Sequence, residues 1–301
     1  MTGPIICVGA AVLDQIYGVA TLPSGAGKHF AGSYRETGGG PAANGAVAIA
    51  RLGGRAALWA RVGSDEVGVR IVGDLAREDI DVSGIRRIEG AVSGVSAIIV
   101  DDDGERMIVN HADPRLDRDP SWLPLGNVDS AGAVLADLRW PEGAIAALTR
   151  ARASSLPAIL DADTTPDVAS VEAMMAATHV LFSQPALRTL SGDEDIAAAL
   201  AIAANRIGGW VGVTCGADGV YWLESGSLRH LPAFPVRTVD TTGAGDVFHG
   251  AFALAIARGE ATDKALRFAS AAAAIKCTRF GGRDGIPVAA DIEHFLKDAA
   301  A

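Results

Sequence analysis

The chain has 301 residues, is 49% hydrophobic and carries a formal net charge of −10 at pH 7, which is enough apolar material for a large core in one or two domains. A nucleic-acid or anionic lipid surface needs clustered Lys and Arg, so the charge argues against both as partners. An anionic small molecule stays open, because it needs only two or three local cations.

The cysteines and the N-terminal residues indicate a cytoplasmic protein. Cys7, Cys215 and Cys277 are far apart and none is in a C-x-x-C pair, which favours reduced structural thiols. The opening "MTGPIICVGAAVLD" has no basic segment and soon reaches Asp14, so we expect no signal peptide. No apolar run approaches the ~18 residues of a membrane span.

In chain order, short apolar runs alternate with Ala-rich helical segments. Candidate strands lie at 5–9, 57–63, 133–138, 158–163, 179–183 and 210–214, with helical patterns such as 43–53 and 193–208 between them. This repetition predicts an α/β fold with a mostly parallel sheet that is flanked by helices on both faces. We find no repeat and no low-complexity linker, so we expect a single domain over 1–301.

Two segments interrupt the alternation. Residues 14–35 hold short alternating pieces around a Pro/Gly-rich turn, and residues 92–111 hold two β-type runs around "DDDG", which is a hairpin signal. We expect the two segments to form a small separate β-sheet, a lid over the strand ends.

Ligands of open α/β sheets bind beyond the carboxyl ends of the strands. The polar residues that follow the predicted strands are therefore candidates for the site, although any one of them could be an ordinary loop residue. They include Asp14, Arg139, Asp161, Asp163, Ser183, Gln184 and Thr214.

The segment 240–250, "DTTGAGDVFHG", places Gly243, Ala244 and Gly245 before an apolar helical run. A turn without large side chains lets backbone N–H groups converge on an anion, and the helix macrodipole favours negative charge there. Asp246 could accept a hydroxyl proton beside this cradle, and we expect it to keep a low pKa. The alternative is that Asp246 only stabilises the first turn of the helix.

A second Gly-rich helix entry is "TGGGPAANGAVAIARLG" at 37–53. Its glycine spacing does not fit a dinucleotide fingerprint, and the chain has no P-loop motif, which disfavours a Rossmann oxidoreductase and a P-loop enzyme. Gly39 and Gly40 permit close backbone approach, and Asn44 supplies an amide on the first helical turn. These groups suit a polyhydroxylated ligand.

The pair "GGGPAAN" and "DTTGAGDVFHGAF" resembles the two signatures of the PfkB (ribokinase-like) carbohydrate kinases, in the same order, with the same separation, and over essentially the whole chain. The resemblance implies a ribokinase-like fold with a β lid. It also implies transfer of the γ-phosphoryl group of ATP, with Mg²⁺, to a sugar or nucleoside hydroxyl, with lid closure excluding water.

The resemblance also implies roles for individual residues. Asp246 becomes the catalytic base, and the turn before it the anion hole, formed by Gly243, Ala244 and Gly245. The sugar ligands become Asp14, Gly39, Gly40 and Asn44. The segment "TCGADG" resembles the nucleotide-binding turn, so the nucleotide contacts become Ser183, Thr214, Gly216, Gly219, Gly243, Gly245 and Ser270. A monovalent cation such as K⁺, on which the family depends to varying degrees, would be held by Asp240 and Thr242.

One departure from the family concerns Mg²⁺. Where the family often has N-x-x-E after a middle strand, this chain has Ser183 and Ala186. We therefore expect Mg²⁺ to depend on water, the nucleotide and other acids.

Four further segments, "SGAGKHFAGSYRETGGGPAAN", "MIVNH", "VLADLRW" and "CTRFGGRDGIP", resemble the sulfofructose kinases. That subgroup phosphorylates 6-deoxy-6-sulfofructose at its 1-hydroxyl, and its substrate residues match Lys28, Asn110 and Arg139. A sulfonate is a compact monoanion with three acceptor oxygens, which a lysine, an arginine and an amide can satisfy.

Other sugars and one other class remain open. A fructokinase, ketohexokinase or ribokinase would share the chemistry without the cationic pair, and a 6-phosphosugar kinase would also need cations. A nucleoside kinase would use stacking residues near the lid, for which Tyr17, Phe30 and Tyr34 are available. A catalytically silent sugar-binding regulator is disfavoured by the intact Asp246. The exposed β surface of a lid favours a homodimer that pairs two lids.

Overall fold

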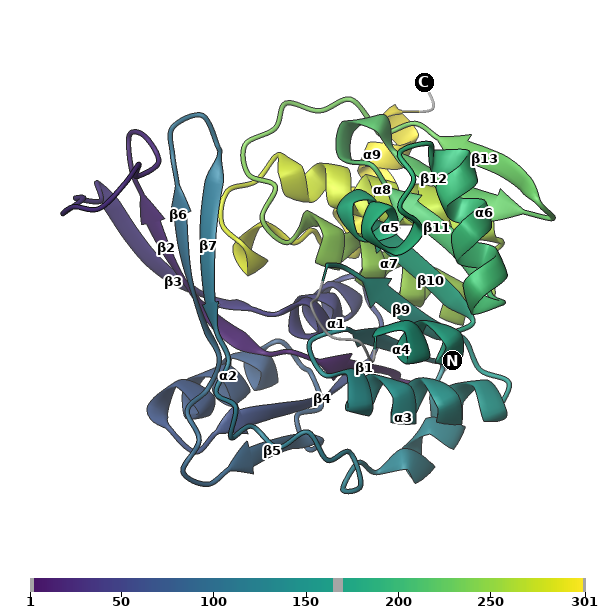
Figure 1. Ribbon diagram of the computed structural model, residues 1–301, viewed down its shortest axis with the longest axis horizontal. Helices are drawn as coiled ribbons and strands as arrows, with labels where there is room; N and C mark the ends of the chain where they lie inside the picture. Colours follow the sequence, from purple (N-terminus) through teal and green to yellow (C-terminus); the bar gives the residue numbers. More distant parts are fainter. Residues whose placement is uncertain (1–2, 165–169, 300–301) are drawn as a thin grey trace.

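The computed structural model describes residues 3–164 and 170–299. They form a large sheet covered by helices on both faces, with a second, smaller sheet projecting from one side (Figure 1). A mostly parallel sheet flanked by helices and a separate small sheet were both predicted from the sequence, and both are confirmed.

The large sheet has the strand order β13-β12-β11-β10-β9-β8-β1-β4-β5. Neighbours from β11 to β5 are parallel, and β12 and β13 add an antiparallel edge. The strands are β1 (Ile5–Gly9), β4 (Ala56–Gly63), β5 (Ile85–Ile88), β8 (Ala133–Asp137), β9 (Ala158–Ala162), β10 (His179–Ser183), β11 (Trp210–Thr214), β12 (Val220–Glu224) and β13 (Ser227–Leu231).

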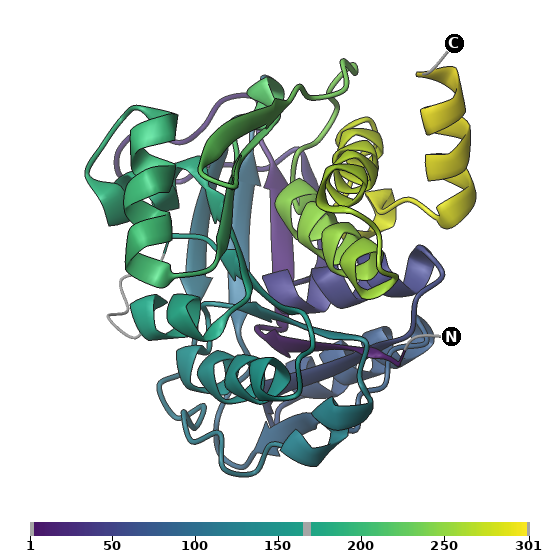
Figure 2. The ribbon, with the colours of Figure 1, turned by 90° about the vertical axis from the view of Figure 1, so that its right-hand side faces the viewer.

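Helices cover both faces of this sheet, as Figures 1 and 2 show. One layer consists of α1 (Pro41–Arg51), α2 (Glu66–Arg77), α7 (Ala244–Ala257), α8 (Thr262–Cys277) and α9 (Ala289–Asp298). The other consists of α3 (Pro141–Ala153), α4 (Ser170–Ala176), α5 (Gln184–Ser191) and α6 (Ile196–Ile207). Short 3₁₀ turns are η1 (Leu125–Ser130), η2 (Gly216–Asp218) and η3 (Arg283–Gly285).

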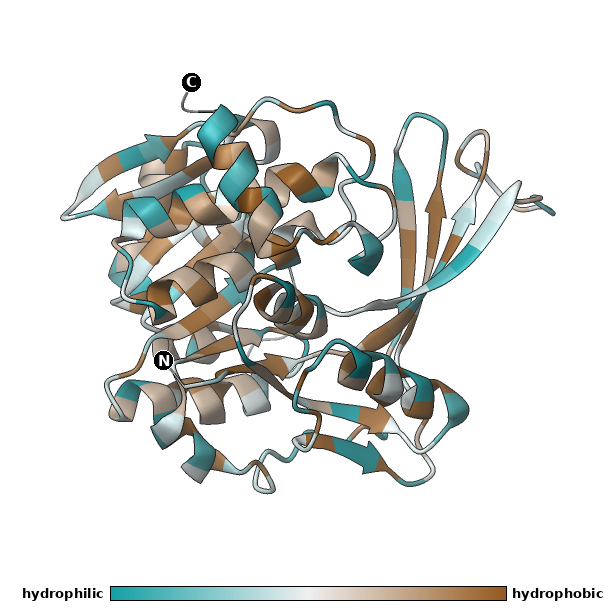
Figure 3. Ribbon diagram, turned by 180° about the vertical axis from the view of Figure 1, so that it is seen from behind, coloured by the Kyte–Doolittle hydropathy of each residue, from teal (hydrophilic) through white to brown (hydrophobic). Residues whose placement is uncertain are grey.

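The central strands read as continuous apolar runs because both of their faces are buried. Along β1, Ile5 and Cys7 join the apolar core beneath α1 and α7, whereas Ile6 and Val8 join the core beneath α3. Figure 3 shows that apolar residues predominate in the central strands, whereas polar residues are frequent on the outer helices. The sheet is therefore fixed from both sides, and its strand ends are a rigid base for a site.

The lid is a four-stranded sheet in the order β3-β2-β6-β7. Strands β6 and β7 are antiparallel around the turn at 101–104, which confirms the predicted hairpin. Only two residues separate β1 from the first lid strand, so the base of the lid lies at the carboxyl end of β1. The lid strands are β2 (Val12–Gly18), β3 (Ser33–Gly39), β6 (Val95–Val100) and β7 (Arg106–His111).

Two smaller expectations concern the cysteines and membranes. Cys7, Cys215 and Cys277 are all free thiols. Within residues 3–164 and 170–299, no helix has the length and apolar character needed to cross a bilayer.

Candidate active site

Asp246 lies on the first turn of α7, directly after the glycine turn. Gly243 precedes the helix with a φ of 76°, in the left-handed region that glycine adopts at little cost. The Asp246 carboxylate accepts a hydrogen bond of 2.6 Å from the Asn44 side-chain amide of α1. The two helices approach closely through glycines, since a Cβ on Gly250 would lie 2.6 Å from the Gly45 carbonyl oxygen. The two signature motifs, about 200 residues apart, therefore meet at one carboxylate.

Arg283, in η3, fixes the orientation of Asn44. Its Nε donates to Asn44 Oδ1 at 2.9 Å, and its terminal nitrogen donates to the Gly39 carbonyl at 2.9 Å. With its oxygen occupied in this way, the Asn44 amide must present its NH₂ group to Asp246. Arg283 is only 5% exposed. We did not single it out from the sequence, where the available signal was one cation in the Gly-rich "GGRDG".

The pKa of Asp246 corrects one expectation. It is raised from 3.8 to about 6, mainly by burial; the Asn44 hydrogen bond opposes the rise, and the neighbouring carboxylates of Asp137, Asp14 and Asp163 add to it. The predicted low pKa is wrong because burial and like charges outweigh the helix terminus. A carboxylate with a pKa near 6 is still mostly ionised at pH 7, yet it is a stronger base than an ordinary aspartate.

Asp137, at the end of β8, was also not singled out. Its carboxylate accepts from the backbone N–H groups of Ala10 and Ala42, each at 2.9 Å, and of Arg139 at 2.7 Å. It thus ties together the start of the lid, the first turn of α1 and the end of β8. The sequence feature that could have pointed to Asp137 is its position as an acid at the end of a buried strand.

The predicted sugar ligands Asp14 and Asn110 lie in one row across the lid. The strand register pairs Thr37 with Asp14, Asp14 with Ser96, and Ser96 with Asn110, so these four side chains share a face of the sheet. Arg106 shares that face by alternation on β7, and it donates to Thr242 beside the glycine turn at 3.3 Å. The polar row therefore faces the start of α7.

Gly39 and Gly40 join the lid to α1. A Cβ on Gly39 would lie 2.1 Å from an Asp14 carboxylate oxygen. Gly40 has a φ of 94°, and a Cβ there would lie 2.4 Å from the Ala10 carbonyl oxygen. Both positions need glycine, because the backbone passes directly against the predicted sugar ligand and the base of the lid.

The predicted anion-binding residues are not brought together by any contact. Arg139 follows β8, donates to the Thr164 carbonyl at 2.9 Å and pairs with Asp163 at 3.2 Å. Its side chain stays 39% exposed. Lys28 is exposed in the loop between β2 and β3, and Asn110 lies on β7 of the lid.

The predicted nucleotide residues lie at the carboxyl ends of β10 and β11. Ser183 and Thr214 are paired in register, and the Ser183 hydroxyl donates to Asp163 at 2.9 Å. Gly216 and Gly219 form the η2 turn that follows, both with positive φ, and a Cβ on Gly219 would lie 2.2 Å from the Leu231 carbonyl oxygen. Ser270 is half-buried on α8.

A buried acid–histidine pair underlies the same edge. Asp161 ends β9, and its carboxylate lies 3.2 Å from Nδ1 of His249 on α7. Burial lowers the pKa of His249 to about 4 and raises that of Asp161, to which the nearby Asp246 contributes. His249 is therefore neutral at pH 7, and the acids around Asp246 disfavour one another's charge.

The described residues offer no preformed set of protein ligands for Mg²⁺ or for K⁺. In the described part of the chain, no group of three or more His, Cys, Asp or Glu side chains could hold a metal. Ser183 caps α5 through the Ala186 N–H, at the positions where N-x-x-E was absent. Mg²⁺ fits this site as a companion of the nucleotide phosphates and water, its usual mode in kinases. The Asp240 loop does not fit a monovalent cation, because Lys276 lies within it.

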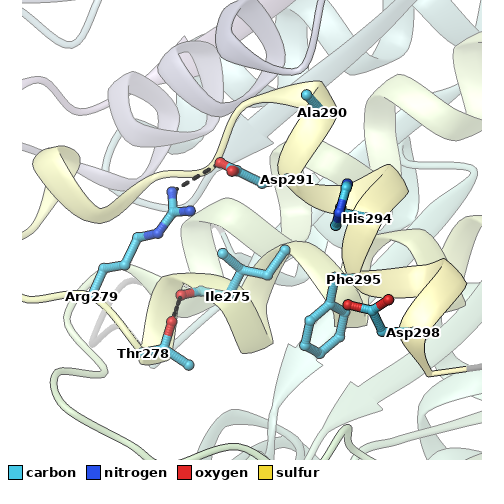
Figure 4. A pocket seen from close by; sticks show the side chains of 8 residues that line it. All are labelled: Ile275, Thr278, Arg279, Ala290, Asp291, His294, Phe295 and Asp298. Atoms are coloured by element: carbon cyan, nitrogen blue, oxygen red, sulfur yellow. Dashed lines mark hydrogen bonds and ion pairs between the residues drawn. The ribbon is translucent and has the colours of Figure 1, made fainter.

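A hollow between α8 and α9 lies apart from these residues (Figure 4). It contains none of the predicted sugar or nucleotide residues, and the Arg279–Asp291 ion pair lies at its edge. Its lining residues are Ile275, Thr278, Arg279, Ala290, Asp291, His294, Phe295 and Asp298. The candidate active site is therefore the carboxyl edge of the sheet and not this hollow.

The structure thus brings together a sheet edge, a glycine turn with an adjacent carboxylate and a facing lid. The family described as "pfkB family carbohydrate kinase" matches residues 4–289, so the chain belongs to the PfkB family of carbohydrate kinases, which transfer phosphate from ATP to sugars.

Individual relatives and solved structures are also sugar kinases by name. The chain is 30% identical to the ribokinase of Haemophilus influenzae over 275 residues, 89% of this chain and 90% of that protein. Among solved structures, a provisionally assigned ribokinase from Agrobacterium tumefaciens is 41% identical with a TM-score of 0.95, covering 100% and 99% of the two chains. Arabidopsis thaliana ribokinase complexed with ribose and ATP is 25% identical with a TM-score of 0.87, covering 99% of each.

Proposed function

We propose that this kinase phosphorylates an anionic ketose, with 6-deoxy-6-sulfofructose at its 1-hydroxyl as the first candidate, and that Asp246 is the base. The observation that carries the chemistry is the Asn44–Asp246 hydrogen bond of 2.6 Å at the first turn of α7. It fixes a carboxylate with a pKa near 6 on the first turn of α7, directly after the turn of small residues at 243–245.

The residues then have distinct tasks. As the sugar oxygen attacks the γ-phosphorus, its proton passes to Asp246, the new O–P bond forms, and the bond to the bridging oxygen breaks to release ADP. The N–H groups of the turn at 243–245 face the equatorial phosphate oxygens and stabilise their charge. When bound with the nucleotide, Mg²⁺ would supply further charge neutralisation.

The lid supplies the contacts to the sugar. Asp14 and Asn110 face the site from one polar row, with Ser96 between them, and Gly39 and Gly40 let the backbone reach the hydroxyl groups. Nucleotide contacts fall to the opposite side, where Ser183 and Thr214 end adjacent strands. The two substrates thus approach Asp246 from opposite directions.

Arg139 supports the choice of an anionic sugar. Its side chain is 39% exposed at a strand end, and its hydrogen bonds to the Thr164 carbonyl and to Asp163 engage two of its nitrogens. A guanidinium has five N–H donors, so a sulfonate could be bound at the same time. Lys28, on the loop between two lid strands, would add a second charge when the lid closes. A fork of fixed donors suits a sulfonate better than a lone ammonium does.

Ribose is the second candidate. The Arg139–Asp163 ion pair already neutralises the guanidinium, and the relatives of this chain include ribokinases. A neutral sugar such as ribose or fructose would need no cation at this position, whereas a 6-phosphosugar would need one.

A coupled ATP-consumption assay separates these candidates. It compares sulfofructose, fructose, fructose 6-phosphate, tagatose 6-phosphate, ribose and adenosine. The proposal expects the highest kcat/KM with sulfofructose. A higher value with ribose would establish the second candidate, and a higher value with a phosphosugar would replace the sulfonate by a phosphate.

Arg139→Met tests the anion contact directly. It keeps much of the stem and removes charge-assisted bonds that contribute about 1.5–3 kcal/mol each, so kcat/KM for an anionic ketose should fall roughly tenfold to over a hundredfold while fructose loses little. Lys28→Met should act alike but more mildly. Arg150→Met is the matched control, because Arg150 pairs with Asp129 on the surface with a similar exposure of 42%. An equal loss on charged and neutral sugars would assign Arg139 to the fold or to the nucleotide.

We further propose a cytoplasmic homodimer that pairs through the lids. Three free cysteines fit a reducing compartment. Apolar side chains on the lid face turned away from the active site fit a contact between two copies.

A further inference from the structure

Lys276, in the last turn of α8, is 0% exposed. Fully buried lysines are rare in proteins unless they are paired. Its ammonium nitrogen lies 3.1 Å from the Asp240 carbonyl oxygen, 3.4 Å from the Arg279 carbonyl oxygen and 3.7 Å from an Asp240 carboxylate oxygen. Three oxygens from two loops therefore surround one fixed positive charge.

The surroundings are built to hold this side chain. A Cβ on Gly285 would lie 2.9 and 3.0 Å from Cδ and Cε of Lys276, so that glycine leaves the space that the lysine stem fills. The Arg279 side chain turns away to pair with Asp291, as Figure 4 shows. Only its carbonyl oxygen faces the ammonium.

Both carboxylate oxygens of Asp240 already accept hydrogen bonds. Its carboxylate accepts from the backbone N–H groups of Thr242 and Gly281, each at 2.8 Å, in addition to facing Lys276. Asp240 thereby joins the segment before α7 to the loop after α8. Two carbonyls and a carboxylate around a single positive charge are the oxygen ligands that a hard monovalent cation would take.

This cluster connects directly to the glycine turn. The residue after Asp240, Thr241, accepts the N–H of Ala244 at the start of α7. Fixing Asp240 therefore fixes the backbone that aims the turn's N–H groups at the transferring phosphate. Lys276 acts on the reaction through this backbone, so it is a positioning residue.

We propose that the Lys276 ammonium takes the place of a dissolved monovalent cation, so that this kinase holds its glycine turn with a built-in positive charge and does not need K⁺. The inference rests on the kinase chemistry of the site but not on which sugar is phosphorylated.

The first test uses the unaltered protein. Rates of ATP consumption and melting temperatures are measured in KCl, NaCl and tetramethylammonium chloride at one ionic strength. We expect rates within twofold of one another and melting temperatures that do not distinguish K⁺. A fivefold or greater stimulation by K⁺, or a melting temperature raised by K⁺ alone, overturns the proposal.

The second test removes the charge. In Lys276→Met, loss of the fixed charge should lower kcat by about tenfold to a hundredfold, the order expected when a reacting geometry loosens, with little change in KM for the sugar. K⁺ should restore part of kcat and raise the melting temperature of this variant, and Na⁺ should do less. Lys264→Met is the matched control, because Lys264 is exposed on the same helix.

A third variant keeps the proposal testable if Lys276→Met does not fold. Lys276→Arg keeps the charge, so it should retain K⁺ independence even at reduced stability. The melting curves need no sugar, so they remain informative if the sugar is wrongly identified. Two results would show that Lys276 is only structural. In the first, Lys276→Met has an unchanged kcat. In the second, the substitution lowers the melting temperature alone, and K⁺ changes neither kcat nor the melting temperature.

Discussion

At the scale of single residues, the site brings negative charges together where the reaction creates more of them. Asp246 lies near Asp14, Asp137 and Asp163, all of which raise its pKa. An enzyme that only needed a stable helix start would not cluster acids there. Repulsion among these carboxylates lowers the stability of the fold, but each neighbour raises the pKa of Asp246 and so makes it a better acceptor for the sugar proton.

Asp246→Asn should keep the fold and lose the base. The new amide is isosteric, and its oxygen can still accept from Asn44. We expect kcat to fall on the order of 10²–10⁴-fold, the usual range for loss of a general base. Circular dichroism and the coupled assay check this, and a folded variant with nearly normal turnover would remove Asp246 from its role.

The same carboxylate predicts the pH dependence of the reaction. Its pKa is raised to about 6, so it becomes protonated and inactive as the pH falls through that value. We expect kcat/KM to decline about tenfold per pH unit below pH 6, because this parameter reports the free enzyme. A profile that stays flat down to pH 4.5 would contradict the assignment.

Stability should respond with the opposite sign. The pKa of Asp246 is higher in the folded chain, about 6, than its ordinary 3.8, so its contribution to stability is present at low pH and is lost as the pH rises through 6. Asp246→Asn removes this loss and should melt at a higher temperature than the wild type at pH 7.5. An equal or lower melting temperature would show that the Asn44 contact outweighs the burial of charge.

Sequence reasoning found residues that belong to a recognisable local pattern. It missed residues whose contacts lie far away along the chain. Asp246 and Asn44 each follow a glycine-rich turn at a helix start, so both could be selected. Arg283 and Asp137 could not, because their partners lie 239 and 95 residues away along the chain. The pKa of Asp246 was misjudged for the same reason, since its neighbours come from separate strands.

At the scale of elements, strands that are buried on both faces were the easiest to predict. The six predicted strands all belong to the large sheet, within one or two residues at each end. The antiparallel pair β12 and β13 was not predicted, because β13 is exposed and polar along most of its length. Lid boundaries were also approximate, since β7 is exposed throughout and shows no alternation in burial.

The lid should become more resistant to proteolysis when sugar is bound. Its polar row faces the active site, and Arg106 already reaches Thr242 across the gap at 3.3 Å. A sugar held between the lid and Asp246 would add contacts on both sides, so closure should protect residues 14–35 and 92–111. Limited proteolysis with mass spectrometry measures this. Unchanged cleavage at saturating sugar would indicate a rigid, open site.

At the scale of the whole molecule, the two faces of the lid differ in character. The inner face carries Asp14, Ser96 and Asn110. On the outer face, the register aligns Tyr34, Tyr17, Ile99 and Met107 in one row. The next row holds Val109, at 62% exposure, together with Ala97, Gln15 and Glu36. Exposed apolar side chains near an edge strand invite pairing with another sheet. A second copy of the same lid offers the complementary surface through a two-fold axis.

Met107→Lys and Val109→Lys, combined in one variant, should therefore separate the dimer. Each places a charge on the apolar outer face, while neither side chain shares the inner face with Asn110, so the polar row keeps its geometry. We expect light scattering after gel filtration to give twice the chain mass of 30.8 kDa for the wild type and the single mass for the variant. Ile202→Lys is the control, because Ile202 is an apolar residue on α6 with 40% exposure, close to the 41% of Met107. A wild-type protein of single mass at micromolar concentration, or a variant that remains dimeric, would rule out pairing through this face.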